Sequence, residues 1–194
     1  MGEVKTELKI KKASLKKEGL ELEYDQILES EEDGPVVNAI KLTGGHKPHP
    51  DLVKAFNPLV LHLALICDQV TEASADAVIH SIGKGGKKKD VTLLLSSLRQ
   101  SSITQACEVT GFSIGGSDEH EGVVLIGNRK LSSGSVLNLT SPFQKFESEY
   151  KHKEDLEIQL NILIQECIEY INGKHAPNPQ LELELDTNKK EEAA

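Results

Sequence analysis

Residues 20–25, with the sequence LELEYD, alternate apolar and acidic side chains with a period of two. This period is typical of a β-strand with one buried face and one solvated face. The preceding segment, residues 17–19, has the composition of a turn, so we expect a hairpin formed by the segments on either side of it. Opposite charges on the two segments predict cross-strand ion pairs of Lys9, Lys11 and Lys16 with Glu21 and Glu23.

Helical periodicities appear twice further along the chain. Apolar residues at helical spacing follow Asn57-Pro58, an N-cap and a residue suited to the first helical position, and they predict a helix over 58–71. The same spacing predicts a second helix over 153–172, with acidic residues in its first turn and Gly173 after its end. Strands are predicted over residues 36–42, 105–114, 121–127, 133–141 and 181–185.

These elements predict an α+β fold with a mainly antiparallel sheet and two long amphipathic helices. The order strand-strand-strand-helix occurs twice, which suggests a duplicated architecture without a residue-level repeat. We expect a single domain over residues 1–188 of the 194 residues, interrupted by a basic Gly/Lys insertion near 72–103. Residues 189–194 are expected to form a disordered tail.

Composition and charge exclude several classes of protein. The net charge of -9 argues against generic attraction to nucleic acid or to anionic lipid. Arg99 and Arg129 are the only arginines and there is no Trp, which disfavours a dedicated reader of DNA bases. No apolar run approaches the length of a membrane span, and the three cysteines stand far apart in apolar stretches. We therefore expect a cytoplasmic protein with buried thiols and no membrane partner.

Two polar turns carry the residues best suited to binding a ligand. The first is GGHKPHPD, residues 44–51, and the second is GGSDEHEG, residues 115–122. Glycines allow a backbone to approach a ligand closely, while Lys and His supply hydrogen-bond donors for an anion. The predicted ligand-binding residues are Gly44, Gly45, His46, Lys47, His49, Lys84, Lys87, Gly115, Gly116 and His120.

If the two turns met, they would also offer ligands for a divalent metal that activates water. The metal ligands under this alternative are His46, His49, Asp51, His120 and Glu121. Neither turn has the spacing of a known zinc signature. A simpler interpretation is that prolines fix the first turn, that His49 or Asp51 caps a helical turn, and that the second turn is a solvated hairpin tip.

The basic segment GKGGKKK, residues 83–89, is interpreted as a solvated loop, as a contact for phosphates, or as a docking segment. It lacks the residue order of a P-loop, since Asp90 follows it instead of Ser or Thr. Contact with nucleic acid is expected only through Lys84–Lys89. The chain has no GxSxG elbow, and we expect His62 and His80 to be packing or surface residues.

Three stretches in the C-terminal part, GFSIGGSDEHEGVVLIGNRKL, LNLTSPFQKF and EYINGKHAP, resemble small uncharacterised α+β proteins carried by bacteriophages and related mobile elements. The resemblance covers about the C-terminal third and includes no motif with an assigned role, so no site residue is transferred from it. It implies a bacterial host cytoplasm and a role in phage replication, assembly or counter-defence.

From these features we expect a non-catalytic, self-associating binding protein that captures an anionic ligand such as a nucleotide and needs no cofactor. Self-association is suggested by Leu181, Leu183 and Leu185, which alternate with Glu and suit a sheet edge that a second copy covers. The first alternative is a metal-dependent hydrolase or nuclease built on the His, Asp and Glu residues above. The second is a structural or replication accessory protein that forms a ring or lattice.

Overall fold

A computed structural model describes residues 5–17, 19–30, 34–71, 73, 91–117 and 120–177. The predicted Lys84–Lys89 contact, the strand over 181–185 and the tail over 189–194 lie outside the described residues, as does His80. The described part combines an antiparallel sheet with helices and confirms the predicted α+β class.

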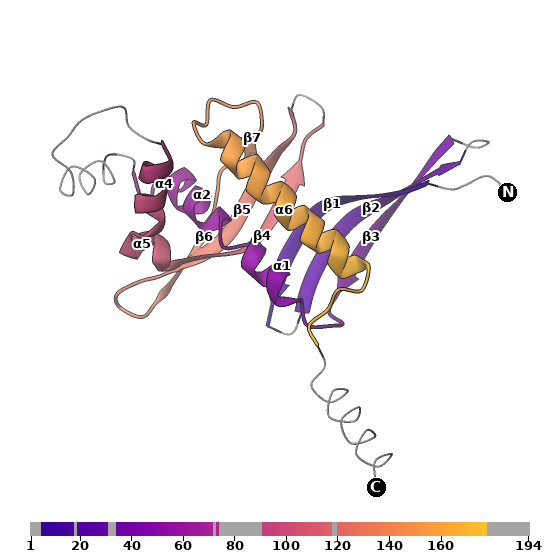
Figure 1. Cartoon of the computed structure of the whole chain (residues 1–194), viewed down its shortest axis with the longest axis horizontal. Coiled ribbons are helices and arrows are strands. Elements are labelled where there is room, and N and C mark those ends of the chain that lie inside the picture. Colours follow the sequence, from indigo (N-terminus) through magenta and orange to yellow (C-terminus); the bar gives the residue numbers. More distant parts are fainter. Residues whose placement is uncertain are drawn as a thin grey trace, which may run out of the picture.

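One antiparallel sheet has the strand order β3-β2-β1-β4-β5-β6, and the short strand β7 pairs with one end of β5. The strands are β1 (Lys5–Lys16), β2 (Gly19–Ser30), β3 (Gly34–Thr43), β4 (Cys107–Gly115), β5 (Gly122–Lys130), β6 (Val136–Thr140) and β7 (Gln144–Lys145). The sheet therefore consists of two three-stranded meanders that meet where β1 pairs with β4 (Figure 1).

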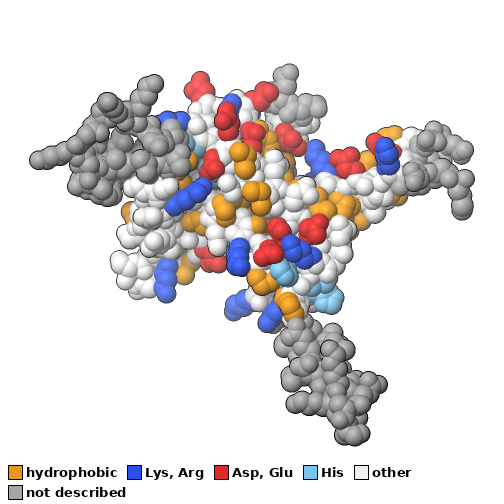
Figure 2. Space-filling model, viewed as in Figure 1, with side chains coloured by type: hydrophobic (Ala, Val, Ile, Leu, Met, Phe, Trp, Pro, Cys, Tyr) orange, Lys and Arg blue, Asp and Glu red, His pale blue; other side chains and the backbone are white. Residues whose placement is uncertain are grey.

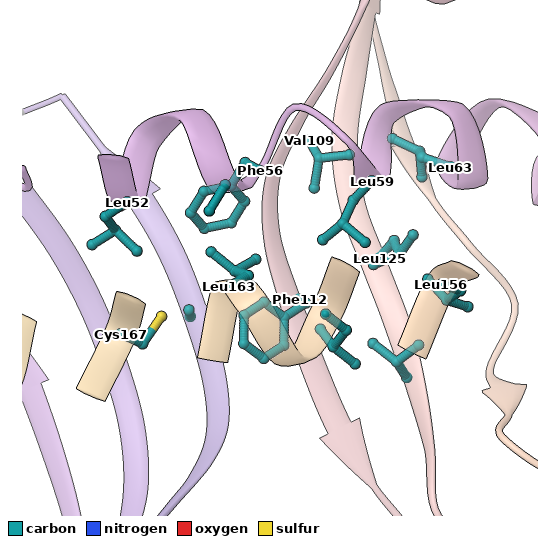
Figure 3. Close-up of a cluster of buried hydrophobic side chains, with 14 of the residues drawn as sticks. Leu52, Phe56, Leu59, Leu63, Val109, Phe112, Leu125, Leu156, Leu163 and Cys167 are labelled. Carbon is teal, nitrogen blue, oxygen red and sulfur yellow. The ribbon is translucent and has the colours of Figure 1, made fainter. Parts of the chain in front are cut away.

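Helices α1, α2 and α6 pack on the same face of the sheet, with α6 running diagonally across it (Figure 1). The described helices are α1 (Pro50–Ala55), α2 (Leu59–Ile66), α4 (Val91–Arg99), α5 (Ser102–Gln105) and α6 (Lys153–Ile171). Leu163 of α6 and Phe56 and Leu59 of the α1–α2 region converge on Phe112 and Leu125 of the sheet (Figure 3). This contact forms the hydrophobic core between the two layers.

The predicted hairpin before and after residues 17–19 is present, and its charged side chains lie on the face opposite the helices. Lys16 pairs with Glu21 at 3.3 Å between Nζ and Oε2, as expected. The other predicted pairs are replaced: a bulge between Ile10 and Lys12 shifts the register of β1. As a result Lys12 binds Glu23, Lys11 binds Asp25, and Lys9 binds Glu121 in the β4–β5 connection.

The helix predicted over 58–71 is shorter than expected. It begins at Leu59 and ends at Ile66, because Asp68 takes a left-handed conformation with φ 54° and the next amides turn back to bond the carbonyl of Ala64. Val70 is buried, which explains why its position continued the helical pattern. Helix α1, which precedes α2, was expected only as a helical turn capped by His49 or Asp51, and His49 does cap it by accepting a hydrogen bond from the amide of Asp51.

The helix predicted over 153–172 is confirmed as α6. Glu154 and Asp155 lie in its first turn, and Gly173, with φ 100°, follows its end. None of the helices in the described ranges has the length and apolarity needed to cross a bilayer.

Candidate functional site

The two polar turns predicted to bind a ligand lie far apart along β1. Lys16 pairs with Gly19, and a Cβ on Gly19 would lie 3.5 Å from Gly44, so the first turn is next to the C-terminal end of β1. The second turn is next to the middle of the strand, because Glu121 binds Lys9 at 3.1 Å. The seven residue-to-residue steps from Lys9 to Lys16 span about 23 Å at roughly 3.3 Å per step. Figure 1 shows the two connections at opposite edges of the sheet.

The structure therefore does not bring the proposed metal ligands together. His46, His49 and Asp51 belong to one end of the sheet, and His120 and Glu121 belong to the other. Within the described ranges, no group of three or more His, Cys, Asp or Glu side chains is arranged to hold a metal ion. The single site that would have joined the two turns is not formed.

The second turn, which contains Gly115, Gly116 and His120, is a close-packed hairpin connection. A Cβ on Gly116 would lie 2.0 Å from the carbonyl oxygen of His120, and Gly116 has φ 82°, so backbone geometry accounts for this glycine. Glu121 is engaged by Lys9, and the side chain of His120 is exposed. These contacts match the simpler interpretation of a hairpin tip.

The first turn is held in place by the C-terminal end of α6 and the residues after it. Gly44 and Gly45 both have positive φ, 75° and 101°, and redirect the chain from β3 toward α1. The hydroxyl of Tyr170 donates to the carbonyl oxygen of His46 at 2.8 Å. The imidazole of His175 stacks on that of His46, with ring centroids 4.4 Å apart and an interplanar angle of 22°. The turn and the segment after α6 thus form one unit.

Backbone contacts strengthen this unit. Pro48 and His175 form an antiparallel bridge, and the amide of Ala176 donates to the carbonyl oxygen of Lys47 at 3.0 Å. Next to it, Lys174 binds Glu166 at 2.9 Å and Asp51 at 3.5 Å, which ties α1 to α6. His49 and Asp51 are therefore engaged in capping and ion pairing, whereas Lys47 is exposed.

A cavity of about 200 Å³ lies between this turn and the end of α6. Its lining consists of Tyr24, Leu42, Gly44, Gly45, His46, Tyr170, Ile171 and His175. Three predicted residues, Gly44, Gly45 and His46, are in this lining. Tyr170 and His175 were not predicted, although a histidine two positions after a helix-ending glycine was a signal that could have been followed.

One residue of this lining, His175, has a polar atom, Nδ1, that stands out. This nitrogen is buried and has no hydrogen-bond partner in the described structure. Burial, and then the neighbouring imidazole of His46, lower the pKa of His175 below its ordinary value. A buried nitrogen without a partner is costly, so a ligand atom that hydrogen-bonds to it would gain affinity.

A second polar cluster surrounds His62, which is fully buried in α2. Its Nδ1 lies 2.9 Å from the hydroxyl of Tyr150, and its Nε2 lies 3.0 Å from a carboxylate oxygen of Asp155. Arg99 donates to the same oxygen at 3.0 Å. Because the carboxylate can only accept, Nε2 carries the proton and Nδ1 accepts from Tyr150. As expected, His62 is a packing residue with satisfied nitrogens.

The cluster joins α2, α4 and α6 and keeps His62 neutral. Burial lowers the pKa of His62 to about 4, despite the opposing effect of Asp155. Although the order Tyr-His-Asp resembles a catalytic relay, an imidazole with this pKa is a weak base at neutral pH. We therefore assign the cluster to stability.

The thiols offer no nucleophile. Cys107 and Cys167 are buried, Cys67 is partly buried, and all three are free. Burial raises the pKa of the Cys167 thiol to about 12 and raises that of the other two.

Comparison with known proteins gives no relative: no family model, no curated protein and no solved structure matches this chain.

Proposed function

We propose that the protein is a non-catalytic binding protein that holds a small oxyanion, such as a phosphate group of a nucleotide, in the cavity beside the first turn. The observation that carries this proposal is the buried Nδ1 of His175, which has no partner in the described structure. An imidazole N–H at that position would donate to an anionic oxygen. Lys47 follows the lining residue His46 in the chain, and its exposed side chain adds positive charge to this turn.

The size of the cavity limits which part of a ligand it encloses. A volume of about 200 Å³ is below the range of roughly 300–1,000 Å³ found for sites that enclose a whole drug-sized molecule. A phosphate group fits, and the remainder of a nucleotide would lie outside, where the ring of His46 is exposed. Gly44 and Gly45 have no side chains, so this wall of the cavity consists of backbone, and their positive φ favours glycine at both positions.

The residues around the cavity favour binding over catalysis. Its described lining contains neither a carboxylate nor a thiol, so it offers no carboxylate ligand for the metal of a hydrolase and no cysteine nucleophile. Its polar groups are two imidazoles, the hydroxyls of Tyr24 and Tyr170, and backbone, and the Tyr170 hydroxyl already donates to His46.

Calorimetry with ADP and with inorganic pyrophosphate tests the proposal, with each ligand measured at pH 6 and pH 8. We expect binding that is stronger at pH 6, because protonated imidazoles attract anions. His175→Phe keeps a ring against His46 and removes the nitrogen, and it should weaken binding at least tenfold. His120→Ala, in the other polar turn, is the matched control and should bind normally. If neither anion gives heat at millimolar concentration, the proposal fails.

Self-association is a second part of the proposed function, and the outer edge of β3 supports it. This ten-residue strand is the last in the sheet order, and Val36 and Val37 on it are 50% and 57% exposed. Long edge strands with exposed apolar residues readily pair with another chain. We expect sedimentation velocity to show a dimer that Val37→Lys dissociates, and a monomer at high concentration would contradict this.

A further inference from the structure

The sheet separates along one side of β1. β1 pairs with β2 along its length, from Lys5 to Lys16, but it pairs with β4 only at Lys12, Ala13 and Ser14. From Lys5 to Ile10, the edge of β1 that faces β4 therefore has no paired strand among the described residues. Backbone donors and acceptors along such an edge can accept an added strand.

A cavity of about 420 Å³ occupies this opening, between β1, the β4–β5 connection and the N-terminal half of α6. Its floor is apolar and consists of Leu8, Ile10, Ile114, Phe146, Leu160 and Ile164. A strand placed beside β1 would direct every second side chain onto this floor, since side chains alternate between the two faces of a sheet.

Acidic residues surround the apolar floor. Glu7, Glu121 and Glu157 line the cavity, and Lys9 is its one basic lining residue among those described. Lys9 is bound to Glu121, whereas Glu7 and Glu157 have no ion pair with any described residue. Figure 2 shows acidic side chains around the upper half of α6, on the same side of the molecule. The opening thus retains negative charge that a basic ligand would neutralise.

We propose that this opening binds an extended peptide segment of a partner protein, with alternating apolar and basic side chains, which adds a strand to the free edge of β1. Backbone hydrogen bonds to residues 5–10 provide the register, and the apolar side chains lie on the floor beneath α6. The basic side chains point to the opposite face of the sheet, where Glu7 lies, and Glu157 of α6 adds negative charge to the opening.

The negative charge around the opening favours a basic peptide over segments of the same chain. Residues 181–185 have the required alternation but carry Glu182 and Glu184, which the acidic rim would repel. The site is separate from the anion cavity, which is next to the opposite end of β1.

Three blocked hexapeptides test the proposal by fluorescence anisotropy. The first alternates Val and Lys. The second has the same sequence with alternate amide nitrogens methylated, which keeps the charge and removes strand pairing. The third alternates Val and Glu. We expect the Val-Lys peptide to bind saturably and at least tenfold more tightly than the other two, and its addition should shift the backbone amide resonances of residues 5–10.

Variants locate the site. Glu7→Gln combined with Glu157→Gln should weaken binding of the Val-Lys peptide at least tenfold. Glu108→Gln combined with Glu169→Gln removes the same charge from exposed positions elsewhere and should leave binding within twofold. Thermal unfolding confirms that all variants are folded.

Equal binding of the methylated peptide, equal loss in the two double variants, or no saturation at millimolar peptide would overturn the proposal. A dimer of the protein alone that Glu7→Gln with Glu157→Gln dissociates would also overturn it, because the occupant would then be a second copy.

Discussion

The imidazoles of His46 and His175 stack with their ring centroids 4.4 Å apart, although 129 positions separate them in the numbering. The contact joins the turn after β3 to the segment after α6. It places the two rings side by side at one cavity, and the imidazole of His46 is one of the causes, after burial, that lower the pKa of His175.

The contact between the turn that contains His46 and the segment that contains His175 should weaken in acid. The pKa of His175 is lowered in the folded protein, so His175 binds a proton more readily when the segment after α6 has detached from the turn. The contact therefore loses stability as the pH falls below the ordinary histidine pKa. Amide hydrogen exchange of Ala176, which donates to Lys47, should therefore accelerate relative to Leu125 between pH 7.5 and pH 5 after correction for intrinsic rates. His175→Phe should abolish this extra acceleration, and its persistence in the variant would contradict the assignment.

Binding of an anion should take up a proton. An oxyanion stabilises the protonated imidazole, and the lowered pKa of His175 leaves that ring mostly neutral before binding at pH 7. Calorimetry with ADP in two buffers of different ionisation enthalpy measures the number of protons directly. We expect a net uptake of between zero and one proton at pH 7, and release of protons would contradict the account.

His62 should make the fold sensitive to acid. Its pKa is about 4 in the folded protein and near 6.5 when unfolded, so the unfolded state binds more protons at intermediate pH. The free energy of unfolding should fall as the pH drops from 6.5 toward 4, by up to about 3 kcal/mol from this group alone. Urea unfolding of the wild type and of His62→Gln at several pH values isolates the effect. Parallel pH profiles of the two proteins would show that His62 does not cause the loss of stability in acid.

Gly127 is required for the contact between α2 and β5. A Cβ at this position would lie 2.0 Å from the carbonyl oxygen of Glu108 and 2.6 Å from a methyl carbon of Leu63. Gly127→Ala should therefore destabilise the fold by about 1–3 kcal/mol, the usual cost of overpacking a core. Gly115→Ala, whose Cβ would meet only Phe143 at 3.7 Å, is the control and should cost much less. Similar urea midpoints for the two variants would contradict this reading.

The periodic elements could be predicted because each depends on neighbouring residues. Alternation over residues 20–25 predicted the strand β2, and spacing over 153–172 predicted α6. Helix α1 was missed because its six residues bury only Leu52 and Ala55, too few to establish a period.

The candidate site could be predicted only in part, because its two halves come from distant segments. Gly44, Gly45 and His46 were recognised from their composition, but Tyr170 reaches His46 across 124 positions, and no local pattern encodes that contact. The same limit explains why the two polar turns were expected to meet. Their separation follows from the register of β1 with β2 and from the pairing of Lys9 with Glu121, and neither is visible in the sequence.

The most direct measurement is a titration of ¹⁵N-labelled protein with ADP at pH 6.5, in which the imidazole nitrogens of His46, His175 and His120 are observed by NMR. The account predicts that the signals of His175 and His46 shift together with one dissociation constant, with the largest change at Nδ1 of His175, while those of His120 stay fixed. Saturating binding that leaves the His175 nitrogens unchanged would contradict it.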